Sequence, residues 1–113
     1  MEKVFDYLEN VAFAACVCDK DGVVLYQNAR SVNRDGDVLG KNLYDCHNPH
    51  AGAMIRHMIE TGESNTYEII RHSKRRLLHQ TPWYETPGGP VSGLIEISID
   101  LPDEYPAFNR DKQ

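Results

Sequence analysis

A helix with clear signals at both ends divides this chain into two groups of strand-like runs, and this order limits the folds open to it. Asn48 and Pro49 suit the N-cap and the first turn, and Gly62 suits the position just past the end. The spacing predicts a helix over residues 49–61 that packs on a sheet through one apolar stripe. The stripe consists of Ala51, Met54, Ile55, Met58 and Ile59.

Runs rich in β-branched and apolar residues predict strands on both sides of this helix. The runs cover residues 13–18, 23–28, 65–72, 75–84 and 91–99. An Asp-Lys-Asp-Gly sequence between the first two, and a loop with two glycines and two prolines between the last two, favour hairpin turns. Two strands, a helical middle and three strands indicate an α+β fold, in which an antiparallel sheet carries the helices on one face.

The remaining segments are less regular. Residues 2–10 can form a short amphipathic helix, whereas residues 29–40 favour turns and short helical pieces. We therefore expect an N-terminal cap helix over residues 1–10, one domain over residues 11–101, and a flexible polar tail over residues 102–113.

Charge and hydropathy exclude several classes of function. The net charge is -5, from 17 acidic and 12 basic residues, which disfavours nucleic-acid binding. The basic cluster within residues 71–76 is interpreted as a solvated hairpin tip. No apolar run approaches the roughly 20 residues that span a bilayer, so we expect a cytoplasmic protein without a membrane partner. Cys16 and Cys18 are two apart on one predicted strand and are expected to be reduced thiols.

Two phrases resemble the PAS sensor family: VCDKDGVVLYQN at residues 17–28, like its opening hairpin, and GLIEISID at residues 93–100, like its closing strand. The stretch GKNLYDCHNPH at residues 40–50 is similar to the Gly-Arg-x-Val-x-x-Cys-His-Pro-Pro motif of PAS domains in DUF438-type proteins. Asn48 takes the place of the first proline, and the portions that accompany the domain in those proteins are absent from this sequence. Their activity is therefore not transferred.

The resemblance implies a five-stranded antiparallel sheet whose inner face, under the helices, encloses a small ligand or packed side chains. The expected function is a sensory and signalling module that binds a small molecule or cofactor in that pocket and relays its occupancy through protein–protein association. The alternative is a ligand-free module for interaction and dimerisation. Expected partners are a second copy of the chain and a separate signalling protein. An enzyme is not expected, because no nucleophile, base and orienting group occur in a recognisable motif.

Cys46 and His47 are the sharpest local feature, because thiolate and imidazole are good ligands for haem iron or zinc. Together with His50 they leave a four-ligand zinc site one group short. A haem would have to use Cys46 or His47, and a redox-sensitive thiol at Cys46 is the other option. The asparagine–cysteine pair of light-sensing flavin PAS domains is absent.

Several polar and aromatic side chains are further candidates to line a pocket. On the strand over residues 75–84, alternate side chains share a face that includes His79 and Trp83, and this face lines a pocket if it points inward. If it points outward, it is available to a partner protein. The candidate ligand-binding residues are Tyr26, Tyr44, Cys46, His47, Met54, Met58, His79 and Trp83.

Overall fold

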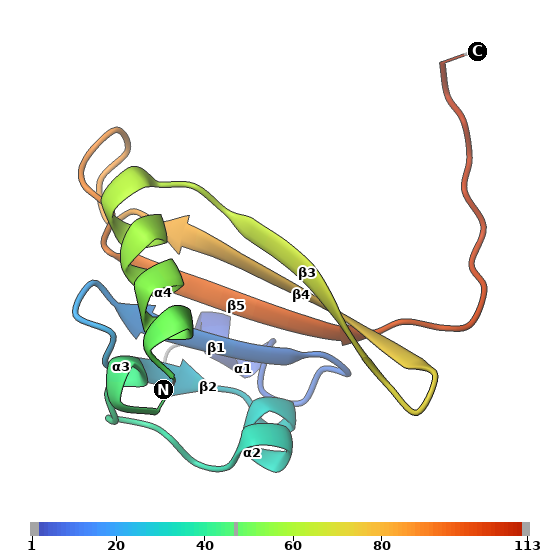
Figure 1. Cartoon of the computed structure of the whole chain (residues 1–113), viewed down its shortest axis with the longest axis horizontal. Coiled ribbons are helices and arrows are strands. Elements are labelled where there is room, and N and C mark those ends of the chain that lie inside the picture. The colour runs from blue at the N-terminus through green and yellow to red at the C-terminus, as the bar shows by residue number, and fades with distance from the viewer. Residues whose placement is uncertain (1–2, 47, 112–113) are drawn as a thin grey trace.

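The computed structural model describes residues 3–46 and 48–111, which form a single antiparallel sheet with short helices (Figure 1). The strands are β1 (Ala14–Asp19), β2 (Val24–Gln27), β3 (Asn65–Arg71), β4 (Lys74–Trp83) and β5 (Gly93–Asp100). The helices are α1 (Lys3–Asp6), α2 (Ala29–Asp35), α3 (Leu43–Cys46) and α4 (Pro49–Thr61). The spatial order β2-β1-β5-β4-β3 places β5 at the centre, and the predicted five-stranded α+β architecture is confirmed.

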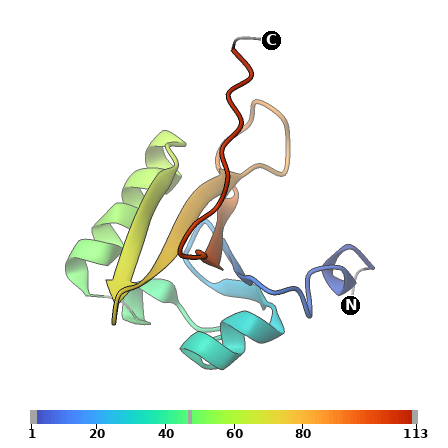
Figure 2. The same ribbon diagram turned by 90° about the vertical axis from the view of Figure 1, so that its right-hand side faces the viewer.

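The helices do not all lie on one side of the sheet. Figure 2 shows α2, α3 and α4 on one face and α1 on the other. We call the face towards α2, α3 and α4 the inner face and the opposite one the outer face. The buried core on the inner side joins Cys18 of β1 and Leu94 of β5 to Ile55 and Met58 of α4. No helix in the described ranges is long and apolar enough to cross a bilayer.

The predicted limits of α4 are confirmed. The Asn48 side chain accepts a hydrogen bond from the Ala51 amide at 2.9 Å, and Gly62 ends the helix in the left-handed conformation, with φ of 78°. The predicted stripe is only partly buried, however. Ile55 and Met58 are buried, whereas Met54 is 37% exposed, because it lies about 100° around the helix from Ile55.

The segment after β2 is more helical than predicted. Asn28, the residue after β2, caps α2 by accepting a hydrogen bond from the Ser31 amide at 3.0 Å, and Gly36 ends the helix with φ of 82°. The expected helix over residues 2–10 is shorter, at Lys3–Asp6. After it, the Leu8 amide donates to the carbonyl of Phe5 at 3.1 Å, and the carbonyl of Glu9 accepts a hydrogen bond from the Ala29 amide at 2.9 Å.

Candidate functional site

A cavity of about 330 Å³ lies between the inner face of the sheet and the helices. One part of its wall is apolar and consists of Val38, Leu43, Ile55, Ile69, Leu78 and Leu94. The other part is polar or charged and consists of Cys16, Cys18, Gln27, Ser31, Arg34, Asp35, Tyr67, Arg76, Gln80, Glu96 and Ser98. The cavity therefore combines an apolar wall with cations and anions, as ligand pockets commonly do.

The strand register decides which side chains reach this cavity. Leu78 of β4 pairs with Ser98 of β5, and Gln80 pairs with Glu96, and all four line the cavity. Because side chains alternate along a strand, the isoleucines of β5 at positions 95, 97 and 99 point to the outer face. In β5, Glu96 and Ser98 thus point towards the helices, and the isoleucines point away from them.

His79 and Trp83 therefore lie on the outer face, and the hypothesis that their side of β4 points inward is wrong. His79 pairs with Ile97, is exposed, and has its Nδ1 2.7 Å from the hydroxyl oxygen of Thr66. Trp83 pairs with Gly93, and its indole Nε1 donates to the carbonyl oxygen of Cys18 at 3.0 Å. Trp83 thus fastens β4 to β1 across the start of β5.

Tyr26 also lies on the outer face, beneath α1. Its ring stacks on Phe5 with centroids 4.6 Å apart, and its hydroxyl donates to a carboxylate oxygen of Glu9 at 3.0 Å. Burial, followed by the Glu9 hydrogen bond, raises the pKa of Tyr26 to about 12. Tyr26 therefore anchors the N-terminal segment.

The remaining candidates lie around the inner layer. Tyr44 of α3 packs against the core, with the Arg56 guanidinium 4.2 Å from its ring centroid, and burial raises its pKa. Within the described part of the chain, neither Tyr44 nor the two methionines of α4 line the cavity. Cys46 ends α3, but its side chain and the whole of His47 fall outside the described part. Ligand binding by the eight candidates stays a prediction.

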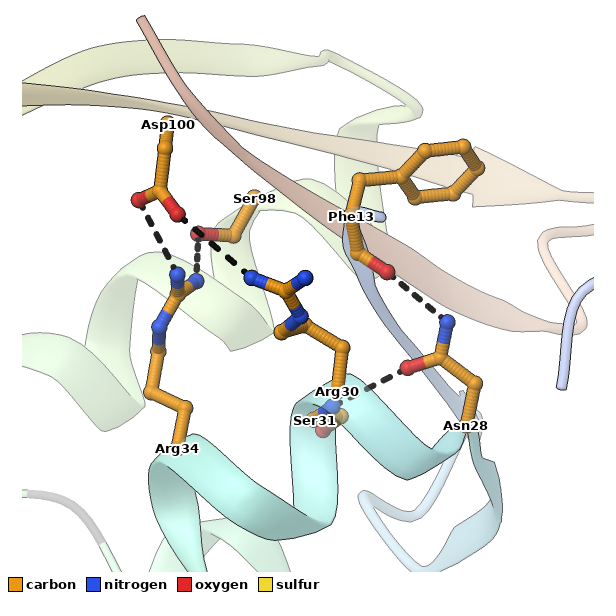
Figure 3. A network of polar contacts seen from close by, with 7 residues as sticks. All are labelled: Phe13, Asn28, Arg30, Ser31, Arg34, Ser98 and Asp100. Atoms are coloured by element: carbon orange, nitrogen blue, oxygen red, sulfur yellow. Dashed lines mark hydrogen bonds and ion pairs between the residues drawn. The ribbon is translucent and has the colours of Figure 1, made fainter. Parts of the chain in front are cut away.

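Arg34 connects the cavity wall to the end of β5. Its guanidinium donates to the hydroxyl of Ser98 and, at 3.1 Å, to the carboxylate of Asp100 (Figure 3). Arg30, one turn earlier on α2, approaches the other carboxylate oxygen of Asp100 at 3.8 Å. These contacts hold α2 to the last residue of the central strand.

Arg76 and Glu96 are the other charged groups of the strands that line the cavity. Arg76 was predicted in a solvated hairpin tip, but the inward parity of β4 brings it to the cavity, so that prediction is wrong for this residue. Its Nε is buried and, over the described ranges, has no hydrogen-bond partner. Glu96 accepts a hydrogen bond from the Gln80 side chain at 2.7 Å.

The cavity thiols are held in their protonated form. Burial and then the Glu96 carboxylate raise the pKa of Cys16 to about 12, and burial raises that of Cys18. Both cysteines are free thiols, and their raised pKa values disfavour the thiolate form that metal ligation requires. Among residues 3–46 and 48–111, no group of three or more histidine, cysteine or acidic side chains is placed to hold a metal ion.

The sequence interpretation missed Arg34, Arg76 and Glu96. One signal was available: Glu96 and Ser98 occupy every second position of a strand that is central in the sheet, where the helices must cover one set of side chains. The pattern alone does not show which set is covered.

Comparison with known proteins agrees with this architecture. The sequence model of the PAS fold matches residues 8–105. The chain belongs to the PAS family. PAS domains are typically sensory and signalling modules, and no curated protein matches the sequence significantly.

Solved PAS structures share the fold at low sequence identity. The PAS domain of the histidine kinase ThkA is 20% identical, with a TM-score of 0.63 over 78% of this chain and 98% of that one. VqmA bound to DPO is 20% identical, with a TM-score of 0.69, and the match covers 89% of this chain but only 57% of VqmA. A solved chain of the Aer2 receptor from Vibrio cholerae, described as a dual PAS-heme oxygen sensor, is 19% identical, with a TM-score of 0.61 over 80% of this chain and 96% of that one.

Proposed function

We propose that this PAS domain is a sensory module that binds a small molecule in the cavity and passes its occupancy on through protein–protein association. The observation that carries the proposal is the inverted pattern of β5, in which Glu96 and Ser98 face the cavity while the isoleucines face outward. Placing polar groups under the helices costs free energy unless they find partners, and the buried Nε of Arg76 in the same cavity wall has none within the described residues. A filled structural core would instead point the isoleucines inward.

Arg34 supports a route for the relay. It belongs to the cavity wall and also pairs with Asp100, the last residue of β5, after which residues 101–111 lead away from the sheet (Figure 1). A ligand that draws the guanidinium into the cavity weakens its contact with Asp100. Ligand binding would thereby alter how the chain leaves the sheet.

The outer face supports the second candidate function, a ligand-free module for interaction and dimerisation. Leu77 of β4 and the isoleucines of β5 lie on this face, and Ile99 is 42% exposed. An apolar sheet face of this kind suits a second copy of the chain or a separate signalling protein. In the leading proposal the same face is the output surface.

Haem does not fit the described lining of this cavity. Of the described residues that line it, none is a histidine, and the pKa of both cysteines is raised by burial, which disfavours the thiolate. A haem site would therefore depend on Cys46 or His47.

We also propose the limits and setting of the module. The sensory unit comprises residues 11–101, with residues 1–10 as its cap and residues 102–113 as a flexible connection, and it acts in the cytoplasm without catalysis. The net charge of -5 supports a role without nucleic acid or membrane for these residues.

The test is native mass spectrometry with an ultraviolet–visible spectrum and light scattering on freshly purified, untagged protein. We expect a copurified mass that is lost in Leu78→Phe, which fills the cavity, and kept in Leu77→Phe, one residue along on the outer face. Bare protein in both variants, with a dimer and no thermal shift from metabolite mixtures, would overturn the proposal in favour of the ligand-free module.

A further inference from the structure

We infer that the cavity takes a small bipolar ligand, with a carboxylate at Arg76, an ammonium or other N–H donor at Glu96, and an apolar group packed on the wall of Ile55, Leu78 and Leu94. Free amino acids with apolar side chains are the simplest members of this class. The inference rests on the proposed function, because it names the kind of molecule that the cavity binds.

The first pole is the guanidinium of Arg76. Its Nε is buried and has no hydrogen-bond partner within the described part of the chain, and leaving a buried donor unpartnered is destabilising. Arg34, the other arginine of the lining, is already paired with Asp100. Arg76 is thus the cation with spare donors, and a planar guanidinium recognises a carboxylate through two parallel hydrogen bonds.

The second pole is the carboxylate of Glu96. One of its oxygens accepts a hydrogen bond from Gln80 at 2.7 Å. Across the described residues there is no ion pair between Glu96 and Arg76, so the cavity keeps a negative and a positive group apart. A carboxylate in such a position favours a cationic or N–H donor group on the ligand.

Between the poles lie Leu78 of β4, the hydroxyl of Ser98 on β5 and the phenol of Tyr67 on β3. Arg76 and Gln80 flank Leu78 on the inner side of β4, so about 13 Å of strand separates their Cα atoms. Tyr67 of β3 pairs with Leu78, and burial raises its pKa, while Glu96 raises it and Arg76 lowers it. Both charges therefore act on the same hydroxyl, with opposite effects on its pKa.

The volume limits the size of the ligand. At about 330 Å³ the cavity is near the small end of the range of roughly 300–1,000 Å³ typical of ligand pockets. Ile55, Leu78 and Leu94 provide the wall against which an apolar side chain would pack. An amino acid satisfies the charges, the wall and the size together.

The test uses the twenty free L-amino acids as probes, by thermal shift and then by calorimetric titration of the full chain. We expect saturable binding of at least one apolar amino acid. Its decarboxylated amine and its deaminated acid should each bind about tenfold to a hundredfold more weakly, because each lacks one charge-assisted contact.

Two variants assign the poles. In Arg76→Met, the affinities for the amino acid and for its decarboxylated amine should differ by less than about twofold, because the partner of the carboxylate is gone. In Glu96→Gln, the affinities for the amino acid and for its deaminated acid should likewise differ by less than about twofold. The matched controls are Arg75→Met and Glu68→Gln, whose side chains pair with each other at 3.6 Å on the outer face. If Arg76→Met does not fold, Arg76→Lys keeps the charge without the planar fork and should weaken the amino acid selectively.

The outcomes separate this inference from the proposed function. Failure of all twenty amino acids to bind would overturn the inference, as would a copurified neutral ligand indifferent to both variants. In the second case the proposed function stands. If no probe binds, no mass copurifies and Leu78→Phe changes nothing, the cavity holds water only and both fail.

Discussion

Arg34 and Asp100 form an ion pair of 3.1 Å although 66 residues separate them along the chain. The pair joins α2 to the end of the central strand, and Ser98 accepts a further hydrogen bond from the same guanidinium. Because Arg34 is also part of the cavity wall, one side chain contacts both the proposed ligand space and the start of the C-terminal segment.

Asp100→Asn should have a small global effect and a larger local one. The Asp100 side chain is 61% exposed, so we expect the free energy of unfolding in urea to fall by less than about 1 kcal/mol. The amide of Leu101, which donates to the carbonyl of Arg75 at 3.0 Å, should exchange with deuterium faster. Asp103→Asn, in the exposed tail, is the control, and unchanged exchange at Leu101 would contradict the anchoring role.

Asn28→Ala should be strongly destabilising. Asn28 is fully buried, its Oδ1 accepts from the amides of Ala15 and Ser31, and its Nδ2 donates to the carbonyls of Leu8 and Phe13. Leaving these groups unpaired should lower the free energy of unfolding by about 3–5 kcal/mol in urea denaturation.

The matched control for this change is Asn33→Ala, at an exposed position on the same helix, which should stay within about 0.5 kcal/mol of the parent. Asn28→Asp should also be destabilising, because a carboxylate cannot donate to the two carbonyls. Equal stability of Asn28→Ala and Asn33→Ala would show that the four hydrogen bonds contribute little.

Gly93→Ala should disrupt the start of β5. A β-carbon at this position would overlap the carbonyl oxygen of Cys18 and lie 2.6 Å from Nε1 of Trp83, which donates to that oxygen. We expect a loss of about 3 kcal/mol or more, measured by urea denaturation and by tryptophan fluorescence. Gly89→Ala, in the loop before β5, should cost less than about 1 kcal/mol, and equal costs would argue against close packing at Gly93.

Cys16 should react slowly with iodoacetamide. Its pKa is raised to about 12, so at pH 8 only about one thiol in ten thousand is the reactive thiolate. The alkylation rate, followed by peptide mass spectrometry, should rise about tenfold per pH unit beyond pH 9, where an ordinary thiol levels off. Glu96→Gln should accelerate the reaction, because it removes a charge that opposes the thiolate. A native rate equal to that in urea would contradict the protected environment.

The parts of the fold that local chemistry determines were predictable from the sequence. Asn48 and Gly62 flank α4 directly and set its two ends. Residues that favour turns likewise lie between the strands that pair as hairpins. The extent of α2 was missed because its N-cap, Asn28, follows directly on the last residue of β2, where the sequence predicted a continuing strand. The contacts of the segment after α1 were not predictable either, since the Glu9 carbonyl is bound by a residue 20 positions later.

The candidate site was less predictable, because alternation along a strand does not say which face is covered. The pairing of Leu78 with Ser98 and the position of α4 decide that Arg76 points in and His79 out. Which face of β4 is covered depends on contacts between segments that are distant in sequence. The alternation of side chains along one strand carries no information about those contacts. Arg34 was missed for the same reason, since its partners are 64 and 66 positions away.

Asn28 connects structural elements that lie on opposite faces of the sheet. One amide side chain caps the helix beside the cavity and holds the carbonyl of Phe13 (Figure 3). It also holds the carbonyl of Leu8, in the same segment that leads from α1 on the opposite face. A shift of α2 is therefore transmitted around the β2 edge rather than through the strands. The N-terminal and C-terminal segments are both mechanically attached to the same seven-residue helix.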